Sequence, residues 1–252
     1  MKKRKNSPRK TMLLFLLFLA CSMVVGGLVG SMISIQQSTV REVLEFLGRQ
    51  AIHYSGGAAA AVTVAGFAAA IAIYRRGRKM AMQWDGEDEV YIEEVEERLR
   101  MGLMTISVTM ILVFCLSAMA FSQISNLTEE TWQRILWPLF SMMATMVLLV
   151  TLERKFVELE KQINPEKRGD TFDFRFKKTW LESCDEQERA IIYKSSYRAF
   201  QAAQTAYPIC WGGVMILSIA VDIGVVPYVV IGVLWLTQIL AYYAEASKKH
   251  RR

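Results

Sequence analysis

The chain has 252 residues, of which 53% are hydrophobic, and its 30 Lys and Arg against 24 Asp and Glu give a formal net charge of +6. Its apolar residues are gathered into six long blocks. The length of each block is close to the about 20 residues that a helix needs to cross a bilayer. This pattern excludes an ordinary soluble domain. The positive charge is therefore interpreted as membrane topology and lipid-headgroup contact rather than nucleic-acid binding, and no recognition-helix or zinc-finger pattern argues otherwise.

The blocks are predicted to be helices, because backbone groups in lipid cannot bond to water. We expect one all-α integral membrane domain over residues 1–252, with six transmembrane helices as three hairpins. The predicted spans are Thr11–Ser34, Ser55–Tyr74, Leu103–Ser122, Ile135–Leu152, Ala203–Ile223 and Val225–Tyr243. The second is the weakest because it is rich in Ala, although Arg75 and Arg76 directly behind it favour a span. Pro208 in the fifth indicates a kink or a first turn.

The first block also resembles a bacterial lipoprotein signal, with a basic start, an apolar run and then Ala20-Cys21. However, Phe18 stands where such signals usually have Leu, and the apolar run continues past Cys21 to Ser34. We therefore expect an uncleaved anchor, with processing at Cys21 as the alternative.

Small residues recur every four positions on the first two predicted spans. Gly26 and Gly30 lie on the first, and Gly57, Ala61 and Ala65 on the second. This spacing is more typical of close helix packing than of a pore. We expect the first hairpin to pack tightly, either on itself or in a homodimer.

The distribution of Lys and Arg predicts the orientation, because short loops rich in these residues stay cytoplasmic. Six precede the first span, six lie in residues 75–102, eleven in residues 153–202 and four follow the last span, whereas the alternate segments hold only Arg41, Arg49 and Arg134. Both termini are thus predicted to lie in the cytoplasm of a bacterial cell, with the protein in the cytoplasmic membrane. Residues 153–202 would form the largest cytoplasmic loop.

An amphipathic cytoplasmic helix is predicted directly before the third span. Ile92, Val95 and Leu99 share one of its faces, and Glu96 is spaced to pair with Arg100.

A second such helix is predicted before the fifth span. We expect it to begin near Cys184, with Ser183 and Glu186 as its capping box and Asp185 paired with Arg189. An aromatic stripe on it should face headgroups or neighbouring helices and consists of Tyr193, Tyr197, Phe200 and Tyr207. Ordinary juxtamembrane packing is the favoured interpretation, and a partner-docking face is the alternative. The candidate docking residues are Asp185, Glu186, Glu188, Arg189, Tyr193 and Tyr197.

Before this helix, Phe172, Phe174 and Phe176 alternate with charged residues, which predicts a short strand-like arm. The stretches "INPEKRGD" and "KKTWLESCDEQERAIIYKSSYRAF" (residues 163–170 and 177–200) resemble an uncharacterised family of multi-pass membrane proteins of Firmicutes, a domain of unknown function numbered three-one-six-nine. The resemblance implies a bacterial cytoplasmic-membrane protein and transfers no catalytic residues.

We expect no enzyme, no cofactor and no metal site. The two histidines, His53 and His250, are predicted on opposite sides of the membrane, and nucleotide-binding and serine-nucleophile motifs are absent from the sequence. Two residues are transport candidates, Asp222 at the outer end of the fifth span and Gln238 within the sixth. A water-facing loop acid is the favoured interpretation of Asp222.

The sequence therefore favours a non-catalytic accessory or regulatory membrane component. Its expected partners are the lipid bilayer and either a membrane or cytoplasmic protein or a second copy of the chain. The alternative is a small transporter, or a transporter subunit, for an ion or small solute.

Overall fold

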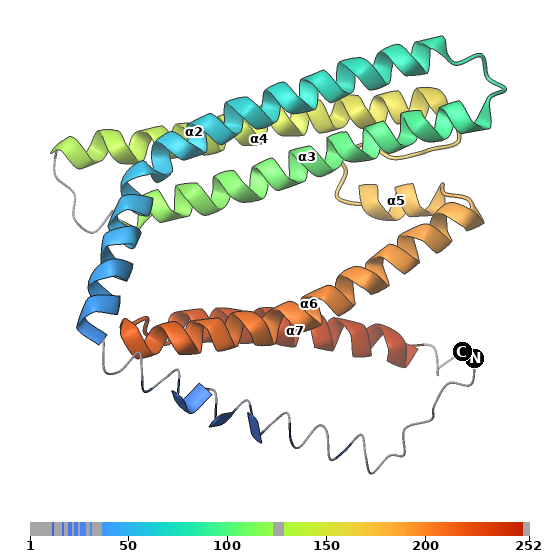
Figure 1. Cartoon of the computed structure of the whole chain (residues 1–252). Helices are drawn as coiled ribbons and strands as arrows, with labels where there is room; N and C mark the ends of the chain where they lie inside the picture. Colours follow the sequence, from blue (N-terminus) through green and yellow to red (C-terminus); the bar gives the residue numbers. More distant parts are fainter. Residues whose placement is uncertain are drawn as a thin grey trace. The chain divides into compact units, whose positions relative to one another are not determined.

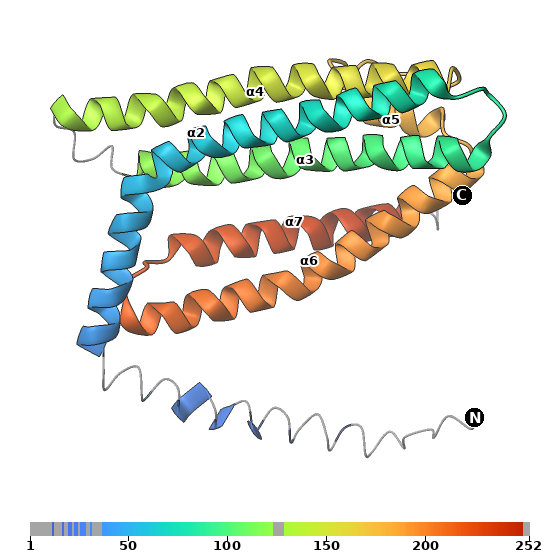
Figure 2. The ribbon, with the colours of Figure 1, turned by 45° about the horizontal axis from the view of Figure 1, so that its top comes forward.

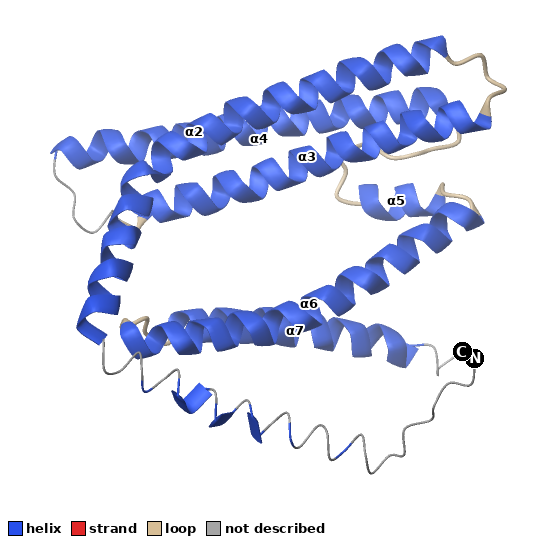
Figure 3. Cartoon of the chain, in the orientation of Figure 1, coloured by secondary structure: helices blue, strands red, loops and turns tan. Residues whose placement is uncertain are grey.

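The computed structural model describes residues 37–122 and 129–248, together with separate positions between 12 and 31. This part of the chain is helical and contains no strand (Figures 1 and 3), so the all-α prediction is confirmed. The helices are α2 (Gln37–Gln83), α3 (Glu89–Phe121), α4 (Glu129–Ile163), α5 (Phe176–Glu182), α6 (Glu186–Ala220) and α7 (Val226–Lys248). Most of the first predicted span lies outside the described residues, including Gly30.

Five of the described helices are long and apolar enough to cross a membrane. They contain the second to sixth predicted spans to within one residue, except that the fifth ends with α6 at Ala220 instead of Ile223. The helices extend well beyond these spans. The predicted outer loop before the second span is helical from Gln37, where α2 begins.

The chain divides into two compact units, residues 48–193 and residues 1–47 with 194–252. In the first unit, α2, α3 and α4 run side by side (Figures 1 and 2). The expectation of a single integral membrane domain stays a prediction.

The buried core of the α2–α4 bundle extends past the predicted spans. The predicted stripe of α3 is confirmed, since Val95 and Leu99 are almost fully buried and Ile92 packs against the same cluster. Helix α4 continues to Ile163, into the segment predicted as the largest cytoplasmic loop, whose place in the cytoplasm stays a prediction. Its buried residues Leu152, Phe156, Leu159 and Ile163 follow at helical spacing and belong to the core. Burial of each such side chain is worth about 1.5–3 kcal/mol.

Close backbone approach occurs at glycines other than the predicted ones. A Cβ atom on Gly66 would lie 2.3 Å from Thr109 Oγ1, and one on Gly102 would lie 2.3 Å from the Phe156 ring. A Cβ atom on Gly26 or Gly57 would meet no described atom within 4 Å. Contact of the predicted small-residue face with a second copy of the chain stays a prediction.

The α2–α4 bundle also contains polar contacts between helices. The hydroxyls of Thr63 and Thr145 lie 2.7 Å apart, and the Ser117 hydroxyl donates to the carbonyl of Pro138 at 3.3 Å. Buried hydroxyls need such partners in an apolar environment.

In the other unit, α6 and α7 form a hairpin held by aromatic contacts. Phe200 stacks on Tyr242 with ring centroids 4.9 Å apart, and Tyr207 stacks on Trp235 at 6.0 Å. The Trp235 indole N–H donates to Gln204 Oε1 at 3.0 Å. Part of the predicted aromatic stripe therefore packs on α7.

The predicted strand-like arm is wrong. Residues 164–175 form successive turns in which the Asp170 and Asp173 carboxylates accept the backbone N–H groups of Phe172 and Arg175, at 3.0 and 2.9 Å. Asp side chains favour such turns because they bond their own backbone two residues on. These local bonds outweigh the alternating pattern, and helix α5 follows directly from Phe176.

Candidate functional site

Charged residues gather at one end of the α2–α4 bundle, in residues 75–100 and 153–163, which we call the charged end. The loop 164–175 and the short helix α5 fold against this end (Figure 1), and we call residues 164–189 the cap. The cap is held in part by Lys161, whose ammonium donates to the carbonyl of Gly169. Its ordered structure depends on a few polar side chains, which form the candidate site.

Lys167 is the central residue of the cap and is only 6% exposed. Its ammonium forms an ion pair with Glu188, donates to Cys184 Sγ at 3.4 Å and lies 5.7 Å from the centroid of the Trp180 ring. Burial tends to lower the pKa of Lys167, but the hydrogen bond and charge of Glu188 outweigh it and raise the pKa above its ordinary value. Lys167 is therefore charged and joins the loop to α5 and α6.

Cys184 is a neutral thiol in this cluster. Burial raises its pKa above the ordinary value, although the Lys167 charge opposes the shift. Reactive cysteines have a lowered pKa, so the environment of Cys184 favours packing over nucleophilic chemistry.

The capping box of α6 differs from the predicted one. The Asp185 carboxylate accepts the N–H of Glu188 at 2.7 Å, and the Glu188 carboxylate accepts the N–H of Asp185 at 3.1 Å. This reciprocal pair starts the helix at Glu186. Ser183, predicted as the capping residue, instead closes α5, where its hydroxyl donates to the Trp180 carbonyl at 2.8 Å and accepts the N–H of Arg168 at 3.1 Å.

Arg189 also has a structural role in the cap. Its guanidinium donates to the carbonyls of Cys184 at 2.7 Å and Glu182 at 3.2 Å, so it satisfies the C-terminal end of α5. The predicted Asp185–Arg189 ion pair is not formed. Thus three of the six candidate docking residues, Asp185, Glu188 and Arg189, are engaged within the cap.

The other candidate docking residues lie on the surface of α6. Glu186 is exposed, and the side chains of Tyr193 and Tyr197 are 60% and 56% exposed. The Tyr197 hydroxyl accepts a hydrogen bond from the side-chain amide of Gln201 at 3.0 Å. The two tyrosines lie one helical turn apart on α6, about two and three turns after its first residue, Glu186.

A pair of carboxylates lies where α3 and α4 meet at the charged end. The side-chain amide of Asn164 donates to Glu96 at 3.0 Å and to Glu160 at 3.3 Å. Burial and the charge of Glu96 raise the pKa of Glu160 to about 7, against the opposing effects of Asn164, Lys167 and Arg100. A carboxyl with this pKa can take up and release a proton near neutral pH.

The sequence interpretation missed this pair. The available signal was the position of Glu160 four residues after Phe156, next to the apolar stripe of α4. The predicted pair of Glu96 with Arg100 is formed, at 3.9 Å.

We expect the charged end to lose stability as the pH rises. The folded-state pKa of Glu160, about 7, exceeds its ordinary value of 4.5, so its contribution is fully present below pH 4.5 and lost as the pH rises through 7. Replacing Glu160 with Gln keeps the acceptor for Asn164 and removes the charge. Thermal unfolding should show E160Q more stable than the wild type by about 1–3 kcal/mol at pH 8, and nearly equal at about pH 4, below the unfolded-state pKa.

The matched control is Glu158→Gln on the same helix, because the Glu158 side chain is 53% exposed and pairs with Arg154 at the surface. E158Q should show no such pH-dependent gain. Equal gains for E160Q at both pH values would contradict the assignment.

The transport candidates are not brought together. Asp222 is exposed in the loop between α6 and α7, where its carboxylate accepts the N–H of Gly224 at 3.2 Å. Gln238 lies about three turns into α7 and donates to the carbonyl of Phe200 at 3.4 Å. In the described part of the chain, no three His, Cys, Asp or Glu side chains are grouped to hold a metal ion.

The family model described as "Protein of unknown function (DUF3169)" matches residues 9–246 of the chain. The chain belongs to this family. The match covers the α2–α4 bundle, the cap and the α6–α7 hairpin. No curated protein and no solved structure matches the chain.

Proposed function

We propose that this member of the DUF3169 family is a non-catalytic, multi-pass component of the bacterial cytoplasmic membrane that acts through protein contacts made by its cap. The observation that carries the proposal is the ordered cap itself. A buried lysine, a capping box and an arginine clamp hold a short segment that covers no identified reaction centre. Such anchoring presents the neighbouring surface in one conformation, which lowers the entropic cost of binding a partner.

The cytoplasmic orientation of this surface is part of the proposal. It is supported by the 27 Lys and Arg in the terminal segments and in residues 75–102 and 153–202, against three in the alternate segments. With this orientation both termini and the cap face the cytoplasm.

The proposed contact surface is formed by Glu186, Tyr193 and Tyr197 on α6. These side chains are exposed and have no role in anchoring the cap. Tyrosine is enriched in protein interfaces because it supplies a large apolar area and a hydroxyl at low entropic cost.

The test is crosslinking in native membranes followed by mass spectrometry. The combined variant Glu186→Lys, Tyr193→Ala and Tyr197→Ala should accumulate normally, because changes of exposed side chains cost little stability. It should lose crosslinked proteins that the wild type retains. Asp185 and Glu188 stay unchanged, since reversing their charges would break the capping box.

The matched control is Glu93→Lys with Glu97→Lys, two exposed positions on α3. This control should retain the wild-type crosslinks. A membrane-impermeant thiol reagent should reach Glu186→Cys only after cells are permeabilised. An unchanged partner list in the α6 variant, or labelling in intact cells, would contradict the proposal.

The second candidate function is a small transporter or transporter subunit. It is favoured by one observation in the α6–α7 hairpin, where Gln204 Nε2 and Gln238 Oε1 are buried without hydrogen-bond partners among the described residues. Unpaired amide groups among apolar helices are costly and often mark functional positions. Measurement of ion or solute flux in liposomes that contain the purified protein would separate the two candidates.

A further inference from the structure

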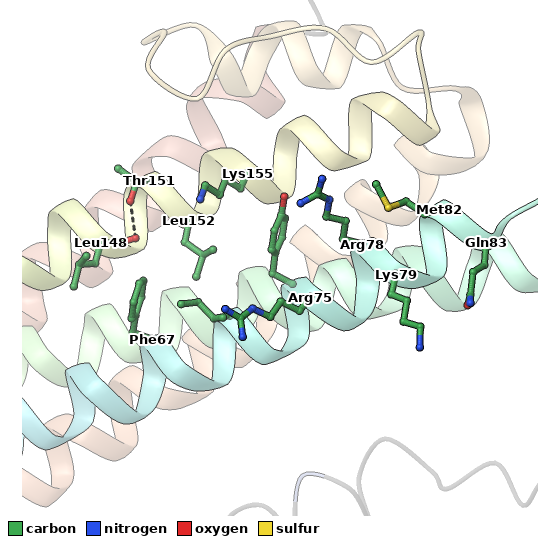
Figure 4. Close-up of a pocket in the computed structure, with 12 residues that line it drawn as sticks. Phe67, Arg75, Arg78, Lys79, Met82, Gln83, Leu148, Thr151, Leu152 and Lys155 are labelled. Atoms are coloured by element: carbon green, nitrogen blue, oxygen red, sulfur yellow. Dashed lines mark hydrogen bonds between the residues drawn. The ribbon is translucent and has the colours of Figure 1, made fainter.

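A groove runs between α2 and α4 toward the charged end (Figure 4). It consists of two cavities of about 580 and 460 Å³, which share the lining residues Phe67, Ile71, Arg75 and Leu148. Because these residues line both cavities, the two form one continuous groove. The whole groove lies within the unit of residues 48–193.

The two ends of the groove differ in chemistry. Away from the charged end the lining is mostly apolar and includes Val64, Ala68 and Ala72. Toward the charged end, its described lining contains four basic side chains and no acidic one. The basic residues are Arg75, Arg78, Lys79 and Lys155.

The basic side chains of the groove form no ion pair with described residues. Two basic residues outside the groove, by contrast, have acidic partners, since Arg154 pairs with Glu158 at 2.8 Å and Arg100 with Glu96 at 3.9 Å. Like charges that gather without a counter-charge repel one another, so this end of the groove favours an anionic ligand.

The depth of the groove matches one leaflet of a bilayer. Arg75 directly follows the second predicted span, and Lys155 lies just beyond the fourth, so the predicted spans place the basic end at the membrane surface. From Thr63 to Arg75 the helix rises about 18 Å. The hydrocarbon of one leaflet is about 15 Å thick. The apolar part therefore lies where acyl chains lie.

We propose that this groove binds one anionic phospholipid of the surrounding membrane. The phosphate is held by Arg75, Arg78 and Lys155, since guanidinium groups match the geometry of phosphate oxygens. An acyl chain follows the apolar lining past Ile71 and Phe67. Basic pockets between transmembrane helices at the cytoplasmic surface are suited to such headgroups.

The test uses the purified full-length protein with phosphatidylglycerol as the anionic lipid and phosphatidylcholine as the zwitterionic one. Native mass spectrometry should show a bound phosphatidylglycerol on the wild type, and this lipid should raise the unfolding temperature more than phosphatidylcholine does. Replacing Arg75, Arg78 and Lys155 with Gln should weaken phosphatidylglycerol binding by about ten-fold or more.

Two further variants separate a groove from general charge attraction. Arg76→Gln, Lys177→Gln and Lys194→Gln remove the same net charge at exposed positions outside the groove lining and should leave lipid binding within about two-fold. Ala68→Trp fills the apolar part while it keeps all basic residues, and it should also lose the lipid.

Three results would overturn the proposal. The first is equal weakening by the groove set and the outside set, which would indicate nonspecific attraction. The second is full lipid binding by Ala68→Trp. The third is equal stabilisation by glycerol phosphate alone, which would indicate a site for a soluble anion.

Discussion

Replacing Lys167 with Met is expected to loosen the cap, because Lys167 joins the loop 164–175 to α5 and to the start of α6. The ammonium of Lys167 is buried and contacts Glu188, Cys184 and Trp180, so its loss leaves the Glu188 carboxylate without its counter-charge. Breaking one partner of a buried ion pair costs about 3–5 kcal/mol. Because the Glu188 side chain is 32% exposed, solvent screening should reduce the cost to about 2–4 kcal/mol. Limited proteolysis should then cut the loop 164–175 well before the helices.

The matched control is Lys178→Met, on α5 in the same cap. The Lys178 side chain is 78% exposed, and its ion pair with Glu182 spans 3.8 Å at the surface. Such pairs are worth about 0–1 kcal/mol, so proteolysis should be unchanged. Adding Glu188→Gln to Lys167→Met should recover part of the loss. Equal protease sensitivity of K167M and K178M would show that Lys167 does not hold the cap.

The helices themselves could be predicted because apolar length and period are local properties of the sequence. The blocks from Ser55 onward lie in helices, and the stripe of Ile92, Val95 and Leu99 correctly predicted a buried face. What was missed is the continuation of α4 through Glu153–Ile163. Charge dominated the interpretation of that segment, although Phe156, Leu159 and Ile163 already had helical spacing.

The cap could not be predicted in detail because alternative hydrogen bonds are possible between residues only a few positions apart in the sequence. Both Ser183–Glu186 and Asp185–Glu188 have the spacing of a capping box, and the sequence alone does not rank them. The structure uses Asp185 because Ser183 closes α5, which depends on where that helix ends. In the same way, Lys167 pairs with a residue 21 positions away, and no local pattern indicates such a partner.

Close packing shows a similar limit. A regular small-residue spacing drew attention to Gly57 and Ala61, whereas the contacts within the bundle are made by Gly66 and Gly102. Each of these glycines is important because of a particular partner side chain on another helix. The spacing of small residues indicates where two helix backbones can approach each other. It does not identify which face of the helix makes the contact.

Gly102→Leu is expected to destabilise the α2–α4 bundle strongly. Even a Cβ atom at Gly102 would lie 2.3 Å from two atoms of the Phe156 ring, which is fully buried and also packs edge-on against Tyr74. The ring cannot move into solvent, so α3 and α4 must separate. Overpacking of a well-packed core costs typically about 1–3 kcal/mol, and the larger side chain should reach or exceed the upper value. The unfolding temperature in detergent should fall by about 5 °C or more.

Gly57 on α2 provides the contrast to Gly102, because both glycines lie inside long helices. A Cβ atom there would meet no described atom within 4 Å, so Gly57→Ala should stabilise α2 by up to about 1 kcal/mol through helix propensity. Gly102→Ala gains the same propensity but clashes with Phe156, so the net change should be a loss of stability. Phe156→Leu shortens the opposing side chain, and the Gly102→Ala loss should be smaller in that background, as a double-mutant cycle would measure. An equal gain for both alanine substitutions would mean that α3 and α4 do not approach closely at Gly102.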